Sequence, residues 1–189
     1  DASYRTDGSS LFGVNKRWAS FFSLGAMWNM KKESFLEDID WLSDLRLKVS
    51  YGTTGNSAFE GDPYYPALGL IGTGLYNGNQ TFGISSVQND DLTWEKQKTL
   101  NVGFNSRFFD RLSVDFDVYN KVTTDMLMTI PHSYTTGHSS GWGNIGSMFN
   151  RGFELTASYD IISNRDIYWS VSANINYNKN EITELFGGR

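Results

Sequence analysis

The chain has 189 residues, a formal net charge of −5 and no cysteine, and 15% of its residues are aromatic. The lack of cysteine excludes a disulfide framework and a thiolate metal site, and the lack of a basic run argues against nucleic-acid binding. No apolar stretch reaches the roughly 18 residues of a membrane-spanning helix, although a barrel strand needs only about 9–11 residues with every second one apolar.

Period-two alternation of apolar and polar residues is the main signal along the chain, and it places alternate side chains on opposite faces of a strand. A first strand is expected to end near Thr6. The alternating segments that follow are 18–28, 45–52, 99–105, 112–119, 152–159 and 167–177. Each has an apolar face opposite a polar face, so we predict about seven antiparallel strands and an all-β fold.

One segment departs from this pattern. Residues 33–42 carry apolar residues at roughly helical spacing, and Ser34 with Glu37 three positions later resembles a capping box. We therefore predict a short helical turn between two strands.

The connections between the predicted strands differ in length. Residues 109–111 form a tight turn and 161–165 a nearly equal one, whereas 53–93 and 123–146 are long and rich in Gly, Tyr and Asn. Short turns on one side and long loops on the other are typical of outer-membrane barrels. Alternation alone leaves two alternatives open, a membrane barrel whose apolar face meets lipid and a soluble β-sandwich whose apolar face packs into a core.

Aromatic residues near strand ends favour the barrel, because they form girdles at both membrane interfaces. The girdle candidates are Trp18, Trp28, Tyr51, Trp94, Tyr119, Tyr159, Trp169 and Tyr177. Strands are rich in aromatics in any case, so the girdle supports the barrel without deciding for it.

Catalytic and metal-binding patterns are weak. No cysteine or nearby acidic cluster joins His132 and His138 in a metal site. Asp115 and Asp117 share a strand face, as the carboxylates of a glycosidase might, but a polar lumen wall also carries solvated charges. We predict no enzymatic activity, no metal and no cofactor.

Aromatic residues in the long loops are the candidates for substrate contact, because flat rings give a large contact area to sugars or peptides. These candidates are Tyr64, Tyr65, Tyr76, Tyr134 and Trp142. The alternative is that the same rings brace the loops or touch a partner protein.

An ordered series of motifs runs over nearly the whole chain. It comprises RTDGSS (5–10), NKRW (15–18), ESFL (33–36), LRLKVSYGTTGN (45–56), NDDLTWE (89–95), FDVYNK (116–121), NIG (144–146), NRGFE (150–154) and YNKNEI (177–182). In this order the motifs resemble the C-terminal half of the barrel in SusC/RagA-type TonB-dependent transporters of Bacteroidota.

The resemblance implies an outer-membrane barrel of about 22 strands, filled by an N-terminal plug domain. It implies a SusD-like surface lipoprotein as partner, energy supplied through TonB, and oligosaccharides or peptides as substrates. Residues 1–189 would then be part of the barrel wall, without the plug domain or the N-terminal strands. The rival hypotheses are a passive barrel that displays loops and a soluble carbohydrate-binding β-sandwich.

Overall fold

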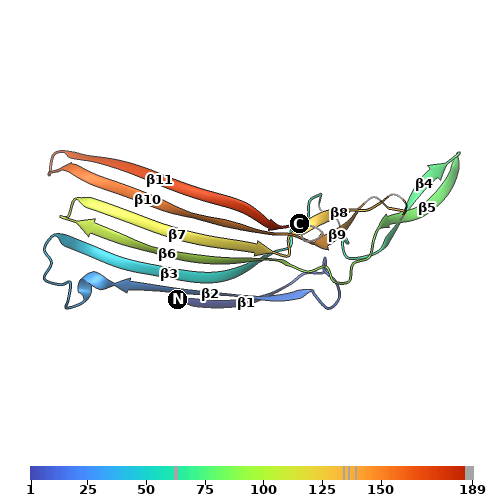
Figure 1. Ribbon diagram of the computed structural model, residues 1–189, viewed down its shortest axis with the longest axis horizontal. Coiled ribbons are helices and arrows are strands. Elements are labelled where there is room, and N and C mark those ends of the chain that lie inside the picture. The colour runs from blue at the N-terminus through green and yellow to red at the C-terminus, as the bar shows by residue number, and fades with distance from the viewer. Residues whose placement is uncertain (62–63, 134, 136, 139, 186–189) are drawn as a thin grey trace.

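The computed structural model describes residues 1–61, 64–133, 135, 137–138 and 140–185. Its main feature is an antiparallel sheet of seven strands in the order β1-β2-β3-β6-β7-β10-β11 (Figure 1). The strands are β1 (Ala2–Gly8), β2 (Trp18–Asn29), β3 (Leu42–Asn56), β6 (Glu95–Phe108), β7 (Leu112–Thr124), β10 (Ser147–Ser163) and β11 (Tyr168–Glu184). The prediction of seven antiparallel strands is confirmed, and most strands extend beyond the alternating segments.

Two hairpins lie within the segments that are predicted to be long loops. They consist of β4 (Leu70–Tyr76) with β5 (Asn79–Ser86), and of β8 (Leu127–Pro131) with β9 (Ser140–Asn144). Asn77 and Gly78 have φ values of 48° and 77°, as a tight two-residue hairpin turn requires. The β4–β5 hairpin projects well beyond the main sheet (Figure 1).

The helical turn predicted over 33–42 is shorter than expected. A 3-10 helix, η1 (Met30–Lys32), comes before it. The Glu33 carbonyl, rather than a Ser34 cap, accepts the amides three and four residues later, both at 2.9 Å. The Lys31 ammonium donates three bonds of 2.9 Å to carbonyls between residues 36 and 39. The segment is therefore a series of turns whose carbonyls are held together by Lys31.

The strand register brings apolar residues together on one face of the sheet. In one row, Val49 pairs with Val102, Val102 with Val118, Val118 with Phe153, and Phe153 with Tyr177. We call the side that carries this row the apolar face and the opposite side the polar face.

Aromatic rings form a ladder on the apolar face across β6, β7, β10 and β11. Phe104 and Phe116 have ring centroids 5.7 Å apart, Phe116 and Phe153 are 6.1 Å apart, and Phe153 and Tyr177 are 5.9 Å apart. These distances allow favourable aromatic pairing, so the ladder ties four strands together through side chains.

The two ends of the sheet differ, as the sequence predicts. At the turn end, β2–β3, β6–β7 and β10–β11 are joined by residues 30–41, 109–111 and 164–167. At the loop end, the connections are residues 9–17, 57–94 and 125–146, and the last two contain the hairpins. Figure 1 shows the three turns on the left and the loops on the right. Among the described residues, no helix has the length and hydrophobicity to cross a bilayer.

Candidate functional site

A row of three residues crosses the polar face between strands that are not neighbours. Lys48 of β3 pairs with Gly103 of β6, and Gly103 pairs with Asp117 of β7. The Lys48 Nζ lies 2.8 Å from an Asp117 carboxylate oxygen. Strands lie about 4.8 Å apart, so the two side chains meet directly above β6. A Cβ at Gly103 would collide with the Asp117 carboxylate and the Phe116 carbonyl, which explains the glycine.

The same ammonium also binds a second carboxylate. Lys48 Nζ lies 2.9 Å from Asp115 Oδ1, on the same face of β7 as Asp117. Both carboxylates are therefore committed to one cation, unlike the acid and base pair of a glycosidase, which must stay free to exchange protons. The sequence places all three residues on polar strand faces, but only the register reveals that they meet.

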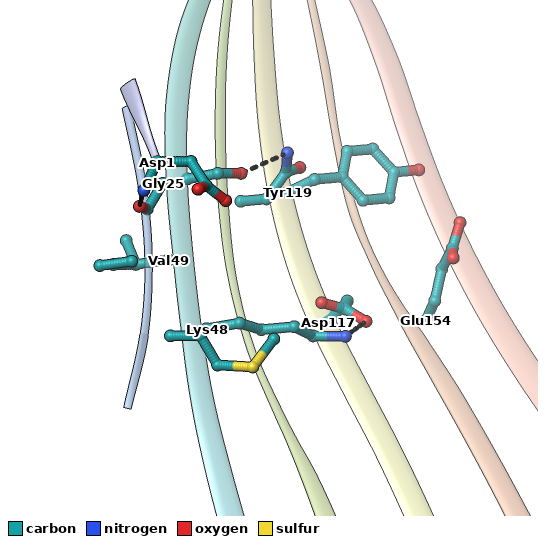
Figure 2. Close-up of a pocket in the computed structure, with 11 residues that line it drawn as sticks. Asp1, Gly25, Lys48, Val49, Asp117, Tyr119 and Glu154 are labelled. Carbon is teal, nitrogen blue, oxygen red and sulfur yellow. Dashed lines mark hydrogen bonds and ion pairs between the residues drawn. The ribbon is translucent and has the colours of Figure 1, made fainter. Parts of the chain in front are cut away.

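An open groove of about 870 Å³ runs over the polar face around this ion pair. Its walls include Lys48, Asn101, Asp117, Tyr119 and Glu154, which come from four of the seven strands. Figure 2 shows the Lys48–Asp117 contact among the residues that line the groove, with Glu154 to its right. Charges of both signs, an amide and a phenol give the groove a surface suited to water and polar solutes.

An aromatic cluster closes the loop end of the sheet. Its buried members are Phe12, Phe21, Phe59, Ala67, Leu92 and Trp94. The rings of Phe12 and Trp94 lie 5.0 Å apart, and the Trp94 indole donates a 3.1 Å hydrogen bond to the Arg17 carbonyl. The Phe21 ring lies directly over Gly55, where any Cβ would overlap it. The loops thus form their own small core.

Two asparagines join the long connections to one another. Asn89 donates to the Trp142 carbonyl at 2.9 Å. The Asn144 amide donates to the carbonyls of Thr93 at 2.7 Å and Asp125 at 2.9 Å, and its oxygen accepts the Thr93 amide at 2.8 Å. The NDDLTWE and NIG motifs therefore hold the loops in place.

The structure does not gather the predicted substrate contacts into one site. Tyr64 and Tyr65 are 86% and 56% exposed in the connection before β4, and Tyr76 is 77% exposed at the tip of the β4–β5 hairpin. Trp142 on β9 packs edge-on against Phe59, with ring centroids 5.0 Å apart. Tyr134 lies outside the described residues. Trp142 braces the loops, whereas the three tyrosines are free to touch other molecules.

Most girdle candidates lie on the apolar face, where their rings are partly or largely exposed. They are Trp18, Trp28, Tyr51, Tyr159, Trp169 and Tyr177. Their contact with lipid remains a prediction. Two residues of the same kind at the turn end, Trp41 and Phe108, stack at 5.9 Å and were missed because Trp41 fell inside the expected helical turn.

Two girdle candidates are corrected by the structure. Trp94 is only 6% exposed, because the loop cluster covers it. Tyr119 lies on the polar face, paired with Asn101 and Gly152, and a Cβ at Gly152 would come within 2.8 Å of its hydroxyl. Neither ring belongs to a girdle on the apolar face.

The two histidines lie close together. The ring centroids of His132 and His138 are 4.8 Å apart, and the rings meet edge to face at an interplanar angle of 71°. Within the part of the chain that the structure describes, no group of three His, Cys, Asp or Glu residues is placed to hold a metal ion.

Comparison with known proteins identifies the family to which the chain belongs. The family model described as "TonB dependent receptor-like, beta-barrel" matches residues 1–188. The chain belongs to the TonB-dependent receptor β-barrel family. Its seven-stranded sheet is a fragment of such an antiparallel barrel, and the resemblance seen in the ordered motifs is confirmed.

Relatives in this family match the chain along almost its full length. TonB-dependent receptor P39 of Formosa agariphila is 38% identical, and TonB-dependent receptor SusC of Bacteroides thetaiotaomicron is 36% identical, each over 97% of this chain. The chain covers only 18% and 19% of these two receptors. It therefore spans about a fifth of their length.

Solved structures also match the chain along its full length. A chain of the RagAB peptide transporter matches 100% of this chain with 42% identity and a TM-score of 0.85, and this chain covers 21% of the matched one. The same importer in its closed-closed and open-open states gives a TM-score of 0.86. The fold of this segment is thus similar to that of the transporter barrel in both states.

Proposed function

We propose that this chain is a wall segment of a TonB-dependent outer-membrane importer that takes up oligosaccharides or peptides together with a SusD-like surface lipoprotein. The observation that carries the proposal is a sheet in which all seven strands share one apolar and one polar face, with long hairpin-bearing connections at one end only. On this proposal the apolar face contacts outer-membrane lipid and the polar face lines the lumen.

The dimensions of the apolar face suit a membrane. On β6 it runs from Leu100 to Phe108, a distance of about 27 Å along the strand. With the usual strand tilt this corresponds to a height of about 20 Å, close to the apolar band of about 25 Å in outer-membrane barrels. A soluble sandwich would instead need a second sheet to cover this face.

Further parts are needed to complete the barrel. Among the described residues, β1 and β11 each pair with a neighbour on one side only, and open strand edges are not tolerated in hydrocarbon. We infer that the remaining strands, and a plug domain that fills the lumen, belong to the same longer polypeptide. Contact with the TonB complex would come from those regions.

The names of the relatives support the substrate class and the partner. One relative is SusC, and the matched structures are of a peptide importer, RagAB. The exposed Tyr64, Tyr65 and Tyr76 are the proposed substrate contacts, and the groove around Lys48 would form part of the polar wall. No step of this function requires catalysis by the chain, so we propose that it is not an enzyme.

The test uses the full-length protein in its native cells, with and without a functional TonB. We expect the protein in the outer-membrane fraction, co-purifying with a lipoprotein in mild detergent, and TonB-dependent uptake of labelled oligosaccharides or peptides. Uptake that persists without TonB would favour a passive barrel. Recovery of the protein in the soluble fraction would favour the β-sandwich and overturn the proposal.

The loop tyrosines allow a sharper test in the same cells. We expect the triple variant Tyr64→Ala, Tyr65→Ala, Tyr76→Ala to reach the membrane normally and to take up less substrate. Tyr159→Ala, at the turn end of the apolar face, is the matched control and should leave uptake unchanged. Equal uptake by the two variants would show that the loop tyrosines do not touch substrate.

A further inference from the structure

The apolar face changes character at the loop end. Above the apolar rows it carries four cations, Lys96 and Lys98 on β6, Arg151 on β10 and Lys179 on β11, which we call the basic patch. Arg151 and Lys179 are register partners on neighbouring strands, and the same row across the sheet holds Leu100 and Asn120. Lys98 lies in the next row toward the loops. The four side chains therefore lie on the side that the apolar rows occupy, away from the groove of the polar face.

The basic patch has an excess of positive charge. Lys179 pairs with Glu181 at 2.7 Å and Lys96 with Asp125 at 3.3 Å. Four cations thus face two carboxylates, which leaves two positive charges in excess. Within the described chain, Lys98 forms no ion pair.

Arg151 is held in place by an aromatic ring. Its guanidinium carbon lies 3.8 Å from the centroid of Phe149, and the Lys179 ammonium lies 5.7 Å from the same ring. Phe149 is 9% exposed, because these side chains cover it. A stacked guanidinium keeps its in-plane N–H donors free, and that planar fork fits phosphate well.

At the turn end of the same face the strands carry no cation, and the cations near it lie in η1 and in the turns beyond the strands. There the strands present Trp28, Phe108, Leu112, Tyr159 and Trp169 on this side. Strand cations on the side that the apolar rows occupy favour anionic headgroups in the adjoining leaflet, here the one beside the long loops.

We propose that the basic patch binds the phosphorylated headgroup of a lipid in the leaflet next to the loops, with the acyl chains of that lipid on the apolar rows below. This inference rests on the proposed membrane location of the sheet. The side chains of Phe153, Val118 and Tyr177 lie one row below Arg151 and Lys179, so a single lipid would contact charge and hydrocarbon together. A transported solute on the polar face would not reach the patch.

The experiment measures lipid retained by the full-length protein. The protein is purified from outer membranes in mild detergent, delipidated, and titrated with diphosphoryl lipid A in native mass spectrometry. We expect binding to weaken about fivefold for each cation removed, and about a hundredfold in the triple variant Lys98→Gln, Arg151→Gln, Lys179→Gln. Dephosphorylated lipid A should bind to the wild-type protein as weakly as diphosphoryl lipid A binds to the triple variant.

Lys121→Gln is the matched control. Lys121 pairs with Thr99 and Asn150 at the same height of the sheet, but on the polar face, so its loss should leave lipid A binding unchanged. Arg151→Lys should retain part of the binding, since the charge remains while the planar fork is lost. If the triple variant does not fold, the lipid A titration is made on the single variants Lys98→Gln and Lys179→Gln, because both of these side chains are exposed.

The outcomes separate this inference from the proposed function. A protein that sits in the outer membrane while the variants bind lipid A like the wild type would overturn the basic patch as a lipid site and leave the importer proposal intact. Equal weakening by Lys121→Gln would also overturn it, because binding would then follow net charge alone. A protein absent from the outer membrane would refute the proposed function itself.

Discussion

Ala173→Arg would place a charge at the middle of the apolar face. Ala173 lies on β11 halfway between Trp169 and Tyr177, and it pairs with Ala157 on β10. Each end of this interval is four residues away, about 13 Å, too far for an arginine to bring its guanidinium to either interface. Because Ala157 is small, the new side chain has room, and the cost is that of the charge in lipid rather than of a steric clash.

The expected loss of folding free energy is about 2–4 kcal/mol, the cost of Arg near the bilayer midplane of a barrel. Asn174→Arg is the control, since Asn174 is the next residue and faces the polar side, paired with Thr156. We expect a change within about 0.5 kcal/mol there. Denaturant titration of the full-length protein refolded into vesicles measures both values.

A second substitution at the same position separates lipid from a protein core. Ala173→Leu should leave stability unchanged or raise it, because it adds apolar surface to a face in contact with lipid. In a packed sandwich core the same change would overpack the site and cost about 1–3 kcal/mol. Equal stability of Ala173→Arg and Asn174→Arg, or a clear loss from Ala173→Leu, would refute the assignment of the apolar face to lipid.

Three further predictions concern the polar face and the loops. Gly103→Ala should cost about 1–3 kcal/mol, because its Cβ meets Asp117, whereas Gly83→Ala, with nothing within 4 Å, should cost almost nothing in the same unfolding titration. Lys48→Met and Asp117→Asn should show a coupling of about 0.5–1 kcal/mol in a double-mutant cycle, and additivity would mean that the ion pair contributes nothing. Trp94→Ala should lower the free energy of local opening of the loops by about 3–5 kcal/mol. We expect faster proteolysis of the loops, while the sheet unfolds at the same denaturant concentration. An unchanged cleavage rate would contradict the loop core.

The strands could be predicted where the two faces differ chemically along their whole length. β7 alternates cleanly between residues such as Phe116 and Asp117, so its position and faces were correct. β2 alternates less cleanly, because Phe21 is apolar on the polar face. The structure explains this exception, since Phe21 lies under the loops and covers Gly55. A local pattern cannot report a contact made by a distant loop.

Two errors had signals in the sequence. Alternation already groups Tyr119 with Asp115 and Asp117 on one face of β7, which excludes it from an apolar girdle. Asn77-Gly78 is a hairpin turn signal between alternating segments, so the β4–β5 hairpin could have been predicted. The Lys48–Asp117 contact had no such signal, because it depends on the register of three strands across Gly103.

The order of strands in the sheet is also their order along the chain, once the two inserted hairpins are set aside. Each strand can therefore pair with the one made just before it, and the wall can grow one strand at a time with only two edges open at any stage. The entropic cost of closing a loop, expressed as free energy, rises slowly with loop length, by about 0.6 kcal/mol per doubling. Insertions such as β4–β5 thus add little to the difficulty of assembly, and the mouth of the barrel is free to diversify while the order of wall strands stays the same.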